Sequence, residues 1–268
     1  MTSVDVIQAV CDADTPGYLG ESINSILAQT RQVHEYIIVR DGSLNRELEA
    51  ILEQYRDRIT LIENHGRKGL AGCLNCAIRH SSAQILVRMD SDDISKPHRV
   101  DILARHFQTD KKLLVLGSGA EEVDDNGNVF FVKAMPKTTG KIVQMAMTRP
   151  PFIHVSVAFK REFFQTVGLY DETYLKAQDY DLWARTIVHH PDLLGRMKNI
   201  DTPLINVRLP EDFWSKRSFS NIRYGTPISL RLIRHFGAYH RLVPLTLKIF
   251  MRLSPAPIKR FSYKYLRN

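Results

Sequence analysis

Three carboxylates lie within four positions of the segment MDSDDIS, at Asp90, Asp92 and Asp93. Neighbouring negative charges repel one another by roughly 1 kcal/mol or more per pair, even near a protein surface. The segment is therefore either a cation site or a solvated turn that caps a helix. Because carboxylate oxygens suit a hard divalent cation, Mg²⁺ or Mn²⁺, that can bridge to phosphate oxygens, we predict a metal site here.

Two related binding patterns fit the chain poorly. Counted as an EF-hand calcium loop from Asp90, the segment has Ser95 where glycine is needed and Asp101 where a bidentate glutamate is expected. The segment GSGAEE begins like a dinucleotide-binding fingerprint but has Glu122 in place of the last glycine. The nearby EVDDNGN, with its Asn-Gly pair, predicts a hairpin turn rather than a calcium loop.

A second acidic motif, AQDYDLW, places Asp179 before a helix-like apolar run. Taken alone, such an aspartate is most often a helix cap. Trp183 could stack on a bound ligand, but its helical spacing with Ile187 favours packing in the core. We interpret His154, in PPFIHVSVAF, as a packed histidine at the start of a strand.

Strands and helices that position these motifs alternate along the first 90 residues. Near-continuous apolar strands between amphipathic helices favour a parallel, doubly wound sheet covered on both faces. Ligands of such sheets bind beyond the carboxyl ends of the strands, where Asp41 and the Asp90 segment fall. We expect strands within residues 4–10, 35–43, 58–64 and 83–90, and helices near 19–30, 48–55 and 70–78.

The second half of the chain has a less regular pattern. A helix from Val100 to Phe107 leads to a strand in LLVLGSG, and DDNGNVFFV adds a turn and another strand. These features predict a mixed arrangement of strands. From Pro203 to Ser220 the sequence is polar and we expect irregular structure.

The net charge of +8 comes entirely from the end of the chain. Residues 213–268 hold twelve Lys or Arg and no Asp or Glu, whereas residues 1–212 hold 25 basic against 29 acidic side chains. This asymmetry indicates an anionic partner. Apolar residues between the basic ones favour an anionic lipid surface, where each Lys or Arg contributes about 1 kcal/mol. RNA binding and a merely solvated basic face are the alternatives.

Cysteine usage and hydropathy indicate the compartment. The three cysteines are too few for a disulfide framework, and the lone C-x-x-C of Cys73 and Cys76 lacks the second pair of a zinc site. The N-terminus lacks a signal-peptide pattern, and no window approaches 18 apolar residues. We therefore expect a cytoplasmic protein, peripheral on the inner face of the plasma membrane.

Five motifs in order give the chain a resemblance to family 2 glycosyltransferases over roughly residues 4–215. They are SINSILAQT, IIVRDGS, ENHGRKGLAGCLNCAI, VRMDSDDISKPHR and AQDYDLW. The last two look most like bacterial transferases that build O-antigen or capsule units on undecaprenyl diphosphate, among them β-1,3-galactosyl- and glucosyltransferases. The resemblance implies an α/β, GT-A fold: a Rossmann-like, mostly parallel doubly wound sheet with a mixed C-terminal half and a basic helical tail.

The resemblance also implies domain boundaries. It places a GT-A domain at 1–212, with a nucleotide-binding half at about 1–117 and an acceptor and catalytic half at about 118–212. Residues 213–268 would form a basic amphipathic region that serves as lid and membrane contact.

Roles follow from the same resemblance, residue by residue. Asp92 and Asp90 would bind the metal, with Asp93 beside them at the donor, and Asp179 would be the general base. For the nucleotide, Asp41 would contact the uracil ring, and Ala9 and Val10 would line the nucleoside pocket. Arg67 would help to hold the nucleotide. Arg208, Lys216 and Arg217 would lie in a flexible segment that closes over the donor diphosphate.

The implied reaction is inverting transfer of a hexose from a UDP-sugar, UDP-Gal or UDP-Glc favoured, with Mn²⁺ or Mg²⁺. The acceptor would be an undecaprenyl-diphosphate-linked saccharide, and no nucleic-acid partner is expected. A sugar-phosphate nucleotidyltransferase is one alternative, but the glycine-rich loop of that class is missing from CDADTPGYLG after the first strand. A non-catalytic membrane-bound module of polysaccharide assembly is the other, and the presence of DSDD with Asp179 disfavours it.

Overall fold

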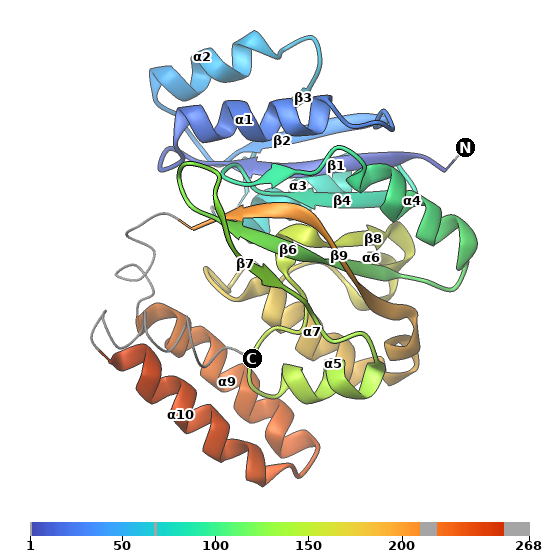
Figure 1. Cartoon of the computed structure of the whole chain (residues 1–268), viewed down its shortest axis with the longest axis vertical. Helices are drawn as coiled ribbons and strands as arrows, with labels where there is room; N and C mark the ends of the chain where they lie inside the picture. The colour runs from blue at the N-terminus through green and yellow to red at the C-terminus, as the bar shows by residue number, and fades with distance from the viewer. Residues whose placement is uncertain (1, 67–68, 210–218, 255–268) are drawn as a thin grey trace.

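The computed structural model describes residues 2–66, 69–209 and 219–254, which fold around one nine-stranded sheet (Figure 1). The first half comprises β1 (Val4–Val10), α1 (Pro16–Leu27), β2 (Glu35–Arg40), α2 (Arg46–Gln54), β3 (Thr60–Glu63), α3 (Leu70–His80), β4 (Ile85–Met89), β5 (Ile94–Ser95) and α4 (Arg99–Thr109). The second half comprises β6 (Val115–Val123), β7 (Val129–Lys133), α5 (Thr139–Ala146), the 3₁₀ helix η1 (His154–Ser156), β8 (Ala158–Lys160), α6 (Arg161–Val167), α7 (Gln178–His189), η2 (Pro191–Arg196), β9 (Met197–Arg208), α9 (Phe219–His235), η3 (Tyr239–Arg241) and α10 (Leu242–Leu253).

The sheet is parallel in its first half and mixed in its second. Strands pair in parallel in the order β3-β2-β1-β4. The short β8 then runs antiparallel between β4 and β6, and β6 pairs in parallel with the long β9. β5 and β7 add antiparallel pairs to β9 and β6. The predicted fold class, mostly parallel with a mixed second half, is confirmed.

Each strand sends alternate residues into two core clusters, one on either face of the sheet. On β4, Leu86 joins the cluster that includes residues of α3, α6 and α7, whereas Val87 joins the cluster of α1, α2 and α4. The period of two therefore places Arg88, like Leu86, on the face that α7 covers. This placement brings the end of β4 toward the second acidic motif.

An aromatic cluster fixes α7 to the sheet. Trp183 is fully buried, with its ring centroid 4.7 Å from that of Phe152 and 5.7 Å from that of Phe159. Buried aromatic pairs of this kind contribute about 0.5–1.5 kcal/mol beyond the burial of their area. The prediction that Trp183 packs in the core is confirmed.

Helix α9 packs beside α7 rather than on the sheet, and α10 packs on α9 (Figure 1). The hydroxyls of Tyr180 and Ser229 lie 2.8 Å apart, and Arg231 pairs with Asp181 at 3.0 Å. No described helix is both long and apolar enough to cross a membrane. The expectation of irregular structure from residue 203 is wrong for 203–208, because β9 continues to Arg208 through its pairing with β6.

Close packing explains the GSG motif of β6. A Cβ added at Gly119 would lie 2.6 Å from the backbone oxygen of Asp201, and one at Gly117 would lie 2.9 Å from the ring of Phe152. Cβ atoms essentially never approach heavy atoms within 3.0 Å. The two glycines are therefore required where β6 pairs with β9, and the motif needs no nucleotide to account for it.

Gly119→Ala should lower the free energy of unfolding by about 1–3 kcal/mol, because the contact at β9 is backbone and can move only with the strand. Urea unfolding followed by circular dichroism measures this. Gly140→Ala is the matched control, since a Cβ there meets nothing within 4 Å and alanine favours a helix more than glycine does. An unchanged midpoint of urea unfolding for Gly119→Ala would show that the paired strands β6 and β9 tolerate a methyl group at this position.

Candidate functional site

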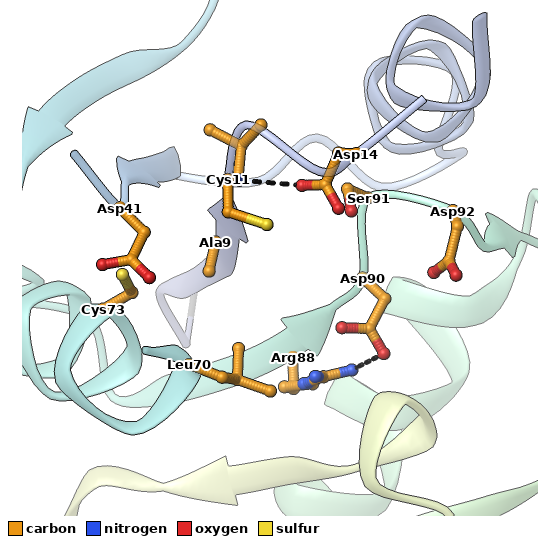
Figure 2. A pocket seen from close by; sticks show the side chains of 11 residues that line it. Ala9, Cys11, Asp14, Asp41, Leu70, Cys73, Arg88, Asp90, Ser91 and Asp92 are labelled. Atoms are coloured by element: carbon orange, nitrogen blue, oxygen red, sulfur yellow. Dashed lines mark hydrogen bonds and ion pairs between the residues drawn. The ribbon is translucent and has the colours of Figure 1, made fainter. Parts of the chain in front are cut away.

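The carboxyl ends of β1, β2 and β4 meet at a pocket of about 330 Å³ (Figure 2). This is where open α/β sheets bind their ligands. The structure brings five predicted residues together in the pocket wall: Ala9, Val10, Asp41, Asp90 and Asp92. The other lining residues are Cys11, Asp14, Leu70, Cys73, Arg88 and Ser91.

Asp41 forms one end of the pocket, directly after β2. Its carboxylate accepts a hydrogen bond of 2.8 Å from the backbone N–H of Gly69, at the start of α3. The Asn64 amide lies 3.4 Å from the other carboxylate oxygen. The Asp41 backbone N–H donates to the carbonyl of Val10, which ties the ends of β1 and β2 together. The side chain is thus held from both sides.

The acidic segment forms the opposite end of the pocket. One carboxylate oxygen from each of Asp90, Asp92 and Asp93 lies within 4.8 Å of the others. Asp92 is exposed at the surface, but the surrounding protein keeps water from part of its carboxylate. This partial burial, together with the charge of Asp90, raises the pKa of Asp92 to about 6. Burial and the charges of its two neighbours raise the pKa of Asp93 well above its ordinary value.

These carboxylates fit a divalent cation. Their oxygens converge, and burial together with the neighbouring carboxylates raises the pKa of Asp92 and of Asp93. A bound cation would reverse that effect by favouring the ionised forms. Asp92, as the most exposed of the three, and Asp90, on the pocket wall, are the residues available to hold it.

Arg208 holds the acidic segment from β9. The backbone N–H of Arg208 donates to Asp93 at 2.9 Å, and Nε donates to the carbonyl of Asp92 at 3.1 Å. Its guanidinium pairs with Glu21 and lies 3.9 Å from the ring centroid of Tyr18. Arg208, expected in a segment that closes over the donor diphosphate, is the last residue of β9 in this structure and pairs with Val123 of β6. Arg208 does not line the pocket.

Asp179 lies in the first turn of α7, one residue inside the helix rather than before it. The preceding Ala177 has φ 62°, a left-handed conformation that costs a non-glycine residue of order 1–3 kcal/mol. Burial raises the pKa of Asp179 to about 6. The backbone N–H of Tyr180 and the charge of Arg88 act in the opposite direction and lower it. Asp179 is outside the pocket wall but on the face of β4 toward which Arg88 points.

His154 lies beside these groups in η1. Its Nε2 is 2.8 Å from the hydroxyl of Tyr170. Burial, together with the charge of Arg88, lowers the pKa of His154 well below its ordinary value, so the ring is neutral at pH 7. The interpretation as a packed histidine agrees with this environment.

Several pocket residues escaped sequence reasoning. The carboxylate of Asp14 accepts a 2.8 Å hydrogen bond from the backbone N–H of Cys11, and burial raises its pKa. An aspartate shortly after a strand was the signal used for Asp41 and Asp90, and it would have found Asp14 too. Arg88 stands out in the sequence as the one charged residue of the apolar strand ILVRM, but the sequence does not show which face of the sheet it occupies. The predicted contacts Arg67, Lys216 and Arg217 lie outside the described residues.

A mostly parallel α/β sheet with a polar pocket beyond its strand ends defines a ligand-binding class of folds. Within that class the chain belongs to glycosyl transferase family 2, since the model of this family matches residues 6–168. The family suggested by the five motifs is therefore confirmed.

Relatives and solved structures agree with this assignment. The chain is 27% identical over 268 residues to the Escherichia coli UDP-Gal:alpha-D-GlcNAc-diphosphoundecaprenol beta-1,3-galactosyltransferase, covering 97% of this chain and 94% of that one. It is 25% identical to the amylovoran biosynthesis glycosyltransferase AmsE of Erwinia amylovora, with 97% of both chains covered. The crystal structure of Staphylococcus aureus TarS 1–349 with UDP-GlcNAc matches with TM-score 0.63 and 16% identity over 89% of this chain and 72% of that one. At this identity the structural likeness shows the fold, GT-A, alone.

Asp179→Asn should stabilise the protein at pH 7, by up to about 3 kcal/mol, because the folded state holds a carboxyl group whose pKa is raised to about 6. A raised pKa means that the folded state favours the protonated form, so the wild type loses stability as pH rises toward and through 6. The gain from Asn should therefore shrink as pH falls below 6 and vanish near 4. Thermal unfolding of both proteins from pH 4 to 8 measures this; a pH-independent difference would contradict it.

Proposed function

We propose that the chain is an inverting hexosyltransferase that acts in the synthesis of a bacterial surface polysaccharide, such as O-antigen, capsule or exopolysaccharide. The donor is a UDP-sugar, UDP-Gal or UDP-Glc favoured, and the acceptor is a saccharide linked to a lipid diphosphate. The observation that carries the proposal is the pocket that joins Asp41 to the acidic segment, on the same side of β4 as Asp179. The E. coli relative, whose name gives UDP-Gal and a diphosphoundecaprenol acceptor, supports it.

In this proposal Asp179 accepts the proton of the acceptor hydroxyl. A sugar hydroxyl is a weak nucleophile at neutral pH and needs a base within hydrogen-bond reach. A pKa of about 6 leaves the carboxylate ionised at pH 7 and makes it a stronger base than an ordinary aspartate. The acceptor oxygen bonds to the anomeric carbon as the bond to the diphosphate breaks. UDP leaves with the electron pair, and the anomeric configuration inverts.

The other predicted roles concern the donor. Asp92 and Asp90 would hold Mn²⁺ or Mg²⁺, which supplies positive charge for the leaving diphosphate. Asp41 would contact the uracil ring, with Ala9 and Val10 lining the nucleoside end of the pocket. Asp93 supports the metal-binding pair through its bond to β9. Arg67, Lys216 and Arg217 stay predictions for contacts with the nucleotide.

The two alternatives have less support. A sugar-phosphate nucleotidyltransferase needs a glycine-rich basic loop after the first strand, and here that turn is closed by the carboxylate of Asp14. A non-catalytic module has no need of a half-buried carboxyl with a raised pKa at Asp179 or of left-handed strain at Ala177.

Purified protein with Mn²⁺ should transfer hexose from UDP-Gal or UDP-Glc to a synthetic GlcNAc-diphospholipid, measured by release of UDP and by mass of the product. UDP-GlcNAc and UDP-GalNAc complete the donor screen. EDTA should abolish transfer, because Asp90 and Asp92 then lack their cation. Asp179→Asn should lower turnover about 10²- to 10⁴-fold, the usual contribution of a general base.

Retained nucleotide binding distinguishes the loss of the base from misfolding. Asp179→Asn should bind UDP with wild-type affinity in the presence of Mn²⁺, because the base does not touch the nucleotide. Wild-type turnover in this variant would refute the role of Asp179. Transfer at full rate in EDTA would refute the metal site, and no transfer from any of the four donors would refute the proposed function.

The acceptor places the protein at a membrane, and α10 offers a surface for it. Val243, Leu247, Phe250 and Leu253 recur at helical spacing and are 59–72% exposed, while Leu245 on the opposite side is buried. The chain carries only basic charges from residue 213 onward. An exposed apolar stripe in such surroundings suits an anionic lipid surface. We therefore include peripheral association with the inner face of the plasma membrane in the proposal.

Leu247→Ser with Phe250→Ser should weaken co-sedimentation with phosphatidylglycerol-containing vesicles at least about tenfold, because each buried apolar side chain contributes about 1.5–3 kcal/mol. Phe130→Ser is a matched control, since Phe130 is also about half exposed (51%) but lies on β7. Neutral vesicles and 0.5 M NaCl test the contribution of charge. Equal binding by all three proteins would exclude α10 as the contact, and binding to RNA in place of vesicles would support the rival partner.

A further inference from the structure

Arg88 is a buried cation in the floor of the pocket. It is 2% exposed and comes from β4, whose other residues are apolar. Figure 2 shows its guanidinium extending past Leu70 toward Asp90. A buried charge is tolerated only when its surroundings compensate it, so each partner of this guanidinium is informative.

The partners of Arg88 leave part of its hydrogen-bonding capacity unused. Nη1 forms an ion pair with Asp90. Nε has no hydrogen-bond partner within the part of the chain that the structure describes. Leaving a buried donor unsatisfied costs about 1–3 kcal/mol, and more for a charged group. A side chain that is buried, lines the pocket and retains an unused donor is suited to binding a ligand.

Hydrogen bonds fix the backbone of Arg88 in the sheet. Its backbone N–H donates to the carbonyl of Val157 at 3.0 Å, and its own carbonyl accepts from Arg99 at 2.7 Å. Arg99 also donates to the carbonyl of Val155, which joins β4 to η1. The guanidinium is therefore presented from a rigid strand, as a precise binding contact requires.

Arg88 acts electrostatically on both ends of the proposed reaction. It pairs with Asp90 on the donor side. Its charge also opposes the burial that raises the pKa of Asp179, and adds to the burial that lowers the pKa of His154. The alternation of residues along β4, which turns Arg88 toward the face covered by α7, gives the same placement from the backbone alone.

We propose that Arg88 binds the hydroxyl groups of the transferred sugar and so helps to select the donor. This inference rests on the proposed function. In a single displacement, the transferred sugar must lie between the leaving diphosphate and the hydroxyl that attacks it. The diphosphate belongs at Asp90 and Asp92, and the attacking hydroxyl at Asp179, so Arg88 flanks the position between them.

The chemistry of the side chain agrees with this position. A guanidinium offers several N–H donors in a fixed plane, and these match neighbouring hydroxyl groups of a hexose. A site that donates to a particular hydroxyl discriminates strongly against a sugar that presents it differently, because a buried donor would be left unpaired. Arg88 is therefore a specificity-determining residue, distinct from the nucleotide contacts at Asp41 and from the base.

Isothermal titration of wild type and Arg88→Met with UDP, UDP-Gal and UDP-Glc, all with Mn²⁺, tests the proposal. For Arg88→Met, which also removes the partner of Asp90, we expect the ratio of UDP-hexose affinity to UDP affinity to fall about 10- to 100-fold, because the hexose loses a contact that UDP alone never makes. Arg88→Lys keeps the charge beside Asp90 but loses the planar fork, so it should retain UDP binding and lose most of the preference between the two hexoses. If Arg88→Met fails to fold, Arg88→Lys carries the test.

Arg40→Met is the matched control. Arg40, the last residue of β2, also pairs with carboxylates, those of Glu49 and Glu63, but it does not line the pocket. The ratio of UDP-hexose to UDP affinity should be unchanged in this variant. A parallel loss of UDP and UDP-hexose binding in the Arg88 variants would assign Arg88 to Asp90 or the diphosphate and overturn the proposal. If the wild type binds UDP but neither sugar nucleotide, the proposed function itself fails.

Discussion

Repulsion among the carboxylates at the end of β4 is the constraint on which the rest of the site depends. Asp90, Asp92 and Asp93 stay close only because both flanks of their segment are fixed. On one side β4 pairs with β1, and on the other β5 pairs with β9. Arg88 then pairs with Asp90, and the backbone of Arg208 with Asp93. Burial, and after it the neighbouring carboxylates, still raises the pKa of Asp92 and of Asp93, which leaves the segment suited to an added cation.

The periodicity of apolar residues predicted most of the fold, because the elements of its first half can be recognised from short stretches of sequence. Buried parallel strands read as apolar runs, and the helices between them are amphipathic. The second half depends on contacts far apart in the sequence. β8 has only three residues, too few for any periodic signal, yet it sits between β4 and β6. β9 extends to Arg208 because β6 pairs with it, which its polar sequence does not indicate.

The pocket residues that could be predicted from the sequence are those whose place depends only on where a strand ends. Those whose place depends on the direction of a side chain could not be predicted. Aspartates after strands could be placed at the carboxyl edge without a structure, and Asp41, Asp90 and Asp92 lie there. Arg88 reads as one polar residue in an apolar strand, and only the sheet order shows which face it occupies. The strand position of Arg208 could not be predicted, because its backbone hydrogen bond to Asp93 joins residues 115 positions apart.

Packing in the middle of α7 supports unfavourable geometry at its N-terminus. Trp183 is buried among aromatic rings near the middle of the helix, whereas Ala177 is left-handed just before it. The pKa of Asp179 reflects two opposed effects there, since burial raises it and the N–H groups of the first turn lower it. Burial without a helix terminus would keep such a carboxyl protonated at pH 7, and a terminus in water would leave it a weak base. A buried N-terminus, held in place by Trp183, gives a carboxylate that is both ionised and basic.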